Sequence, residues 1–314
     1  MSLFFNFFTK TLSVAVFLFS ACNAISGEMA DQPYLTKEFS ISTPGELEVL
    51  TSGGSIDVSS HAGSNVRVEM FVRKGGRDIE KSDKDAAEAL EDFEIEIEKS
   101  GNKVIASAER DGGSWFGNNN VSISFKVSVP KEMSCDLRTS GGSINLKGVS
   151  GVQDLKTSGG SLNIADIKGN MEAKTSGGSI NIDNYAGILD ASTSGGSINL
   201  KNAKGDLAVS TSGGSIHLED IKGSLTARTS GGGIKANLAS LEKELRLSTS
   251  GGSITAVIPG GLGLDLDLKG NRVNTKLTNF DGEVEKDRIK GSINGGGIPV
   301  VMSTSGGSVN LEYR

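Results

Sequence analysis

Apolar and polar residues alternate along most of the chain, and a short motif interrupts the alternation at regular intervals. The tetrapeptide Thr-Ser-Gly-Gly occurs nine times, beginning at Thr51, Thr139, Thr157, Thr175, Thr193, Thr211, Thr229, Thr249 and Thr304. From Thr139 to Thr229 the spacing is 18 residues every time, and the next step is 20. A fixed short period of this kind is the sequence signature of a solenoid, in which each repeat adds one coil to a stack.

Alignment on the threonine separates inward from outward positions. Aliphatic residues stand five and seven positions after it, as Ile180 and Ile182 do after Thr175. Because strand side chains alternate with a period of two, each repeat predicts two strands, joined by Gly-Gly at a sharp corner. A second glycine column predicts the return corner: Gly151, Gly169, Gly187, Gly205 and Gly223. The sequence therefore predicts an all-β fold, a right-handed parallel β-solenoid with about 18 residues per coil.

The regions on either side of the regular repeats are expected to close the stack. Residues 36–133 predict a strand-rich head that contains one early repeat and one short helix at residues 86–93, with Ser82 as its N-cap. The regular solenoid is expected over residues 134–259. Residues 260–314 predict degenerate repeats and a C-terminal cap, because a bare solenoid end would expose an open sheet edge.

The first 24 residues predict a secretory signal. Lys10 is followed by an apolar run at residues 12–19 and then by small residues. The apolar run is too short to span a membrane. Two processing alternatives remain open. The sequence FSAC resembles a lipobox and would place a lipid on Cys22, whereas cleavage after residue 24 would leave a free protein. With residues 25–35 as a linker, we expect an exported protein: an outer-membrane or periplasmic lipoprotein, or a free periplasmic or cell-surface protein.

Composition and charge narrow the classes of partner and cofactor. Hydrophobic residues make up 36% of the chain and aromatic residues only 5%, which favours a thin aliphatic core. The 43 glycines come with only 5 prolines, which excludes collagen. A net charge of −6 without a basic block argues against nucleic acid as a partner. Cys22 and Cys135 are the only cysteines, so neither a disulfide framework, a cysteine metal site nor a cofactor is expected.

Two outward columns carry charge along the predicted solenoid. Three positions before successive threonines stand Asp136, Asp154, Glu172 and Asp190. One position before stand Arg138, Lys156 and Lys174. Opposite columns side by side predict a charge-compensated, solvated face, and the alternative is a strip that binds cations or a basic peptide. The four carboxylates are therefore candidate partner contacts.

Two further features bear on binding. Six positions after the threonines stand Asn145, Asn163, Asn181 and Asn199, which predict a ladder of stacked amides with a structural role.

A polar stretch at residues 112–120 holds the only tryptophan, Trp115, beside Phe116. Such a pair is either an anchor for a partner or a cover for the end of the head.

The alternative of an enzyme rests on two carboxylates. Asp183 and Glu219 occupy equivalent positions two coils apart, about 9.6 Å by strand spacing, which is near the upper limit for an inverting glycosidase. The predicted solenoid has only Tyr185 as an aromatic residue, however, and sugar clefts normally stack on several. The glycine corners lack both the GK[ST] of a phosphate loop and the aspartate of a calcium repeat.

The order of these elements resembles a known family. A strand ending in Val129-Pro130, the TSGGSI repeats, INGGGI at residues 293–298 and a terminal TSGGSVNL are similar to the bacterial putative-adhesin family with β-strand repeats, a domain of unknown function. The resemblance covers roughly residues 36–314 and implies an exported envelope or surface protein without established catalysis.

Three functions follow in order of preference. The first is a non-enzymatic, adhesin-like envelope protein that binds a surface or a macromolecule, protein or glycan, through outward faces of the solenoid. The second is a lipid-anchored periplasmic scaffold or envelope-stress accessory protein, which would meet the membrane only through Cys22. A carbohydrate-active β-helix enzyme is the distant third.

Overall fold

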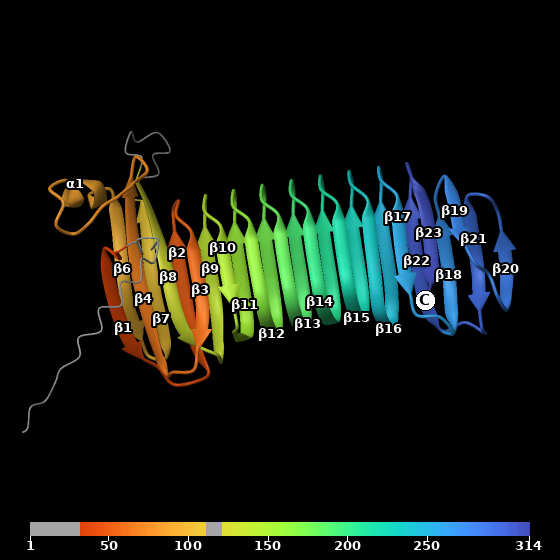
Figure 1. Cartoon of the computed structure of the whole chain (residues 1–314), viewed down its shortest axis with the longest axis horizontal. Coiled ribbons are helices and arrows are strands. Elements are labelled where there is room, and N and C mark those ends of the chain that lie inside the picture. The colour runs from red at the N-terminus through yellow and green to blue at the C-terminus, as the bar shows by residue number, and fades with distance from the viewer. Residues whose placement is uncertain (1–31, 111–120) are drawn as a thin grey trace, which may run out of the picture. The chain divides into compact units, whose positions relative to one another are not determined.

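The computed structural model describes residues 32–110 and 121–314, which belong to one compact unit, Gln32–Arg314. In these residues 23 strands form one mostly parallel sheet, accompanied by one short helix (Figure 1). This is the all-β solenoid that the repeat period predicts. Within the described part of the chain, no helix has the length and apolar character needed to cross a membrane.

The regular coils are stacked strands in register. They are β12 (Leu162–Thr175), β13 (Ile180–Thr193), β14 (Ile198–Thr211) and β15 (Ile216–Thr229). From β12 to β15, paired residues are 18 positions apart, as Ile180 and Ile198 are. The Thr-Ser-Gly-Gly corner separates one strand from the next, as predicted.

The return corner differs from the prediction of two separate strands per coil. Each of these four strands bends halfway while its pairing continues on both sides of the bend. In β12 the bend uses two positive φ angles, 59° at Asp166 and 120° at Gly169. The left-handed conformation turns the chain without an intervening loop, and Asp and Gly are among the residues that tolerate it best.

The core is a narrow stack of aliphatic columns between the two halves of each coil. Ile144, Ile180, Ile198 and Ile216 are each 0% exposed. The repeat threonines are also buried, at 4–6% exposure. The repeat threonine and the isoleucine five positions after it therefore both face inward.

At the N-terminal end, the early repeat is a coil of the stack. β2 (Gly45–Thr51) pairs in parallel with β9 (Met133–Thr139), and β3 (Ile56–His61) pairs in parallel with β10 (Ile144–Lys147). β10 and the next strand, β11 (Ser150–Thr157), both pair with β12, the first of the regular coils. The intervening chain covers the outer side of this coil. β7 (Lys103–Arg110) pairs with β2, and β8 (Val121–Pro130) pairs with β3.

Antiparallel strands complete this end. β4 (Asn65–Lys74) pairs with β8, β1 (Leu35–Ser40) and the short β5 (Arg77–Asp78), while β6 (Phe93–Ser100) pairs with β7. The helix α1 spans Ala86–Leu90, so the prediction of residues 86–93 was too long because Phe93 begins β6. Ser82 is not its N-cap: Asp85 holds that position and makes no side-chain cap hydrogen bond.

At the C-terminal end, the last repeat is not the last layer. β22 (Ile298–Thr304) pairs with β16 (Ile234–Thr249), and β23 (Ser308–Tyr313) pairs with β17 (Ile254–Ile258). The Thr304 coil therefore stacks directly on the Thr249 coil, and the blue strands of Figure 1 lie out of sequence order.

The chain between these coils lies beyond them. β18 (Leu264–Lys269) pairs with β22, and β19 (Arg272–Thr275) pairs with β23. β21 (Arg288–Ile293) and β20 (Phe280–Val284) then follow as antiparallel strands. Both ends are thus closed in the same way, by a segment that leaves between two adjacent coils and returns.

Candidate functional site

The Thr-Ser-Gly-Gly corner makes hydrogen bonds and close backbone contacts with the neighbouring coil. Thr175 Oγ1 donates to the carbonyl oxygen of Gly160 in the preceding coil at 2.8 Å, and it accepts the Gly178 N–H at 3.3 Å. Ser179 N–H donates to Ser161 Oγ at 3.2 Å. A Cβ on Gly178 would stand 2.0 Å from the Gly160 oxygen, so the coils touch backbone to backbone. The threonine hydroxyl and the second glycine of the motif thus join adjacent coils, which is a structural role, while the first serine is exposed.

The asparagine column forms the predicted ladder of hydrogen bonds. Each Nδ2 donates to the Oδ1 of the preceding coil: Asn163 to Asn145 at 2.8 Å, Asn181 to Asn163 at 3.0 Å and Asn199 to Asn181 at 2.8 Å. Asn145 in turn donates to the carboxylate of Asp57. A carboxylate only accepts, so Asp57 fixes the direction of all four amides. Each amide retains a second N–H and a second acceptor lone pair.

A groove runs beside this ladder across the coils. Its other side is the column two residues further along each strand: Lys147, Ala165, Asp183 and Lys201. The volume is about 510 Å³, within the range of ligand pockets in general. Ala165 is the small member of its column and stands between Lys147 and Asp183. The floor is the strand backbone at the buried residues Leu146, Ile164 and Ile182.

The two carboxylates of the enzyme alternative each have a partner beside this groove. Asp183 Oδ1 accepts a hydrogen bond from Asn202 Nδ2 at 2.9 Å. Glu219 pairs with Lys201 at 3.0 Å, and this hydrogen bond raises the pKa of Lys201. Lys201 occupies the coil between Asp183 and Glu219, so a cation separates the two carboxylates.

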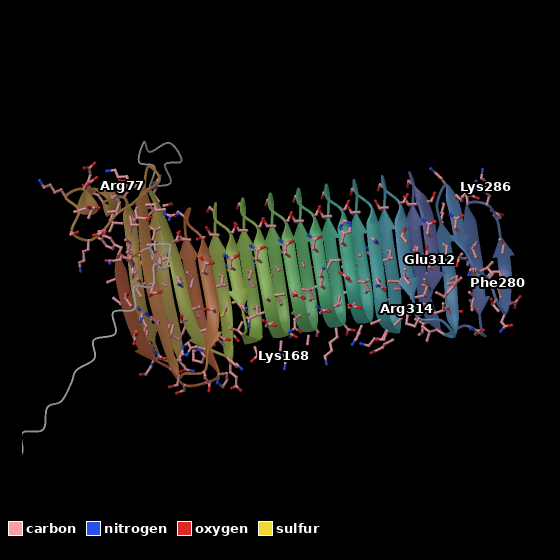
Figure 2. The ribbon with its side chains drawn as sticks, in the orientation of Figure 1. Arg77, Lys168, Phe280, Lys286, Glu312 and Arg314 are labelled. Carbon is pink, nitrogen blue, oxygen red and sulfur yellow. The ribbon has the colours of Figure 1, made fainter. Side chains whose placement is uncertain are left out.

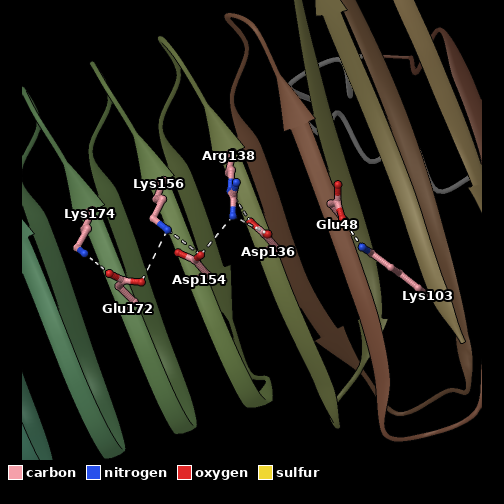
Figure 3. A network of polar contacts seen from close by, with 8 residues as sticks. All are labelled: Glu48, Lys103, Asp136, Arg138, Asp154, Lys156, Glu172 and Lys174. Carbon is pink, nitrogen blue, oxygen red and sulfur yellow. Dashed lines mark hydrogen bonds and ion pairs between the residues drawn. The ribbon is translucent and has the colours of Figure 1, made fainter.

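The charged columns form a continuous network (Figure 3). Arg138 contacts Asp136 at 2.8 Å and Asp154 at 3.4 Å. Lys156 contacts Asp154 at 2.8 Å and Glu172 at 3.7 Å, and Lys174 hydrogen-bonds to Glu172. The contact with Lys174 lowers the pKa of Glu172 from its ordinary value of 4.5. Basic side chains therefore compensate the acidic column from coil to coil, as the alternating charges predict.

The fourth carboxylate of the column lies where this network ends. Asp190 is exposed and pairs across the strands with Glu172 on one side and Ala208 on the other. Towards the head, Lys103 forms an ion pair with Glu48, whose strand neighbour is Asp136. The structure therefore gathers all four predicted carboxylates into one column, with the network as their immediate surroundings.

The remaining candidates divide into buried and undescribed residues. Cys135 is 3% exposed, and burial raises the pKa of its thiol to about 12, which suits an inert core thiol. Cys22, Trp115 and Phe116 lie outside the described residues. Among residues 32–110 and 121–314, no three His, Cys, Asp or Glu side chains are grouped so that they could hold a metal ion.

The sequence interpretation missed one polar column. Nine positions after the threonines, four residues have positive φ angles: Asp166, Asn184, Asn202 and Asp220. Asn184 Nδ2 donates to Asp166 Oδ1 at 2.6 Å, so this corner also has a rung of side-chain hydrogen bonds. The signal was available, because Gly148 holds the same position in the first regular coil and Asn, Asp and Gly share the left-handed conformation.

The comparisons with known proteins concern the fold. No curated protein matches the chain. A crystal structure described as a "putative cell adhesion protein" from Clostridium sporogenes is 12% identical, covers 90% of this chain and 100% of its own, and has a TM-score of 0.20. A "putative adhesin" from Bacteroides fragilis is 12% identical, with 88% and 96% covered and a TM-score of 0.32. Those descriptions belong to those proteins, and similarities this low carry no functional argument. The Toastrack DUF4097 family model matches residues 55–312, and the chain belongs to this family.

Proposed function

We propose that this protein is a non-enzymatic, adhesin-like binding protein that holds an envelope or surface macromolecule in the groove beside the asparagine ladder. The observation that supports this most is the repetition of one chemical group along the groove. Asn145, Asn163, Asn181 and Asn199 present the same amide in the same orientation on successive coils. A ligand that crosses several coils meets the same donor and acceptor at each step.

The groove is a better binding surface than the acidic column. A basic peptide at Asp136, Asp154 or Glu172 would have to displace cations that the protein supplies itself. Exposed ion pairs of this kind contribute little net energy, so exchanging one cation for another gains little. Asp190 remains a proposed secondary contact for a partner that also reaches the other half of the coil, since it follows the bend that Asn181 precedes. Trp115 and Phe116 remain proposed partner contacts and lie outside the described residues.

A binding role also agrees better with the carboxylates than an enzymatic one does. A general acid and base must be available to the reacting atoms. Asp183 and Glu219 are instead engaged by Asn202 and Lys201. We therefore propose no catalysis, no cofactor and no nucleic-acid partner.

Export and anchoring are proposed from the first 24 residues. A lipid on Cys22 would be the only contact with the membrane. The predicted linker of residues 25–35 would separate the lipid from the first strand, except that its last residue, Leu35, already begins β1. Palmitate labelling of the full chain tests this: the wild type should incorporate label and Cys22→Ala should not. Equal labelling of both would show that Cys22 is not lipidated and would favour the free exported form. The proposed binding groove does not depend on this result.

Binding in the groove can be tested by blocking it. Ala165→Lys places in the groove the residue type that Lys147 and Lys201 already provide in the same column, so the coil accommodates it. Ala186→Lys is the matched control, since Lys168 and Lys204 flank Ala186 in a column at the return corner, where Lys168 projects from the stack (Figure 2).

The probes are peptidoglycan, cellohexaose, chitohexaose, collagen and fibronectin. We expect wild type and Ala186→Lys to bind at least one of them alike, and Ala165→Lys to bind it roughly tenfold more weakly or worse. If no probe binds, or if the probe that binds is insensitive to Ala165→Lys, the proposed function is wrong.

A further inference from the structure

The chemistry of the groove indicates the class of ligand that it can hold. This inference rests on the binding role proposed above. We propose that the groove takes a neutral, extended glycan chain that runs along the stack, with successive sugars over successive coils. Three properties of the groove lead to this: the hydrogen-bonding groups that the ladder leaves unused, their spacing, and the balance of charge in the lining.

The unused groups of the ladder match hydroxyl groups. Each asparagine spends one N–H and one lone pair on its neighbours, as Asn181 does with Asn163 and Asn199. The second N–H and the second lone pair of the same amide remain for a ligand. A sugar hydroxyl both donates and accepts, so one hydroxyl, or two adjacent ones, can use both groups of one amide.

The spacing distinguishes a glycan from an extended peptide. Parallel rungs repeat at about 4.8 Å, and side chains of an extended peptide face the same way only every two residues, about 6.7 Å. A peptide along the stack would therefore lose register with the amides within a few residues. In an extended β-1,4-linked chain each sugar advances by about one rung and is rotated by about half a turn relative to the sugar before it. Every rung therefore meets a hydroxyl-bearing edge, and equivalent hydroxyls return to the amides at every second rung.

The charges along the groove are mixed rather than of one sign. Lys126, Lys147 and Lys201 line it together with Asp57 and Asp183. Glu219 neutralises Lys201, and the Asp57 carboxylate accepts from Asn145. A polyanion or polycation would meet its own sign along the way, which costs binding energy, whereas a neutral chain does not.

The apolar part of the lining is shallow and aliphatic. Ala165 leaves a depression between Lys147 and Asp183, where the C–H face of a sugar ring can rest on its methyl group. Among the described residues that line the groove, none is an aromatic on which a ring could stack. Affinity must therefore grow with the number of amides that are engaged, which predicts a dependence on chain length.

A length series tests this directly. The ladder from Asp57 to Asn199 spans four rungs, about 19 Å. For cello- and chito-oligosaccharides of two to six sugars, binding to the full chain should strengthen up to about four sugars and then level off. Affinity that does not change with length would overturn the proposal.

A variant without the central amides separates this inference from the proposed function. Asn163→Thr with Asn181→Thr removes two amides and leaves the groove open; Thr255, the same residue type, already occupies this column. We expect oligosaccharide binding to weaken roughly tenfold, with Ala186→Lys again unchanged. If Ala165→Lys weakens binding of an oligosaccharide and the threonine variant does not, the amides do not hydrogen-bond to the glycan and the proposal is wrong.

The ligand class is decided by the same panel. If collagen or fibronectin binds, Ala165→Lys weakens that binding and no oligosaccharide binds, the groove is a protein-binding site. The glycan proposal is then wrong, and the proposed binding function stands. If nothing binds, both fail together.

Discussion

The hydroxyl of Thr175 lies 2.8 Å from the carbonyl oxygen of Gly160, one coil away, and donates a hydrogen bond to it. All the remaining Thr-Ser-Gly-Gly copies from Thr139 to Thr304 make the same bond, each to a glycine carbonyl oxygen of the neighbouring coil. Thr51 makes the equivalent bond to Ile123 in β8, at the first layer of the stack. One side-chain hydrogen bond per coil thus joins successive Thr-Ser-Gly-Gly corners.

Removing one of these hydroxyls should destabilise the stack measurably. Thr175→Val keeps the shape but leaves the Gly160 oxygen and the Gly178 N–H without their partner. We expect the free energy of unfolding to fall by about 1–3 kcal/mol, because buried polar groups would lose their hydrogen bonds. Guanidinium unfolding followed by circular dichroism measures this. Ser176→Ala, at the exposed neighbouring position, is the control, and an equal effect of both changes would refute the role of the hydroxyl.

The two glycines of a corner should respond differently to alanine. A Cβ on Gly142 would stand 2.0 Å from the Gly54 oxygen, whereas one on Gly141 would make ordinary contact at 3.5 Å from the Gly53 oxygen. The first change forces the backbones of two coils apart, so we expect Gly142→Ala to lower the melting temperature by many degrees or to prevent folding. Gly141→Ala should shift it only slightly. Similar melting temperatures for the two variants would contradict the close approach.

The repeat made much of the architecture predictable. Residues such as Thr175, Ile180 and Ile182 recur at fixed offsets, and in-register stacking turns each offset into a column whose direction follows from the two-residue period of a strand. The same logic predicted the asparagine ladder and the charge-compensated face, in which Lys156 contacts Asp154 and Glu172. These features depend only on local periodicity and on the regular stack.

The ends and the groove could not be predicted in this way. Nothing near Thr304 in the sequence says that its coil stacks on Thr249, because this pairing joins strands separated by the whole of residues 260–297. The groove depends on a small residue, Ala165, in a column of large ones, which matters only once Lys147 and Asp183 are its neighbours. Long-range pairing and the shape of a surface both arise from contacts that the period does not encode.

Acid should loosen the charged network through Glu172. The hydrogen bond from Lys174 holds the pKa of this carboxyl below its ordinary value of 4.5. The folded pKa is thus lower than the unfolded one, so the contribution to stability is present above the ordinary value and is lost as the pH falls through the folded pKa. Carboxyl NMR titration should find a lowered pKa that rises in Lys174→Met. Lys156→Met, which removes the more distant cation at 3.7 Å, should raise it less, and the reverse order would contradict the assignment.

The Cys135 thiol should be unreactive in the folded protein. Burial raises its pKa to about 12, so the thiolate is scarce at neutral pH, and the side chain is inaccessible as well. In a Cys22→Ala chain, a thiol reagent such as dithionitrobenzoate should label nothing until guanidinium unfolds the protein, and then one group. Rapid labelling of the folded chain would show that this part of the core opens.

The groove is tested most directly by the matched lysine pair on one probe. The dissociation constant of whichever probe binds the wild type best is measured for Ala165→Lys and for Ala186→Lys under identical conditions. A ligand lying across Ala165 predicts roughly tenfold or greater weakening for the first variant and no change for the second. Equal affinities of the two variants would show that the ligand does not lie in the groove.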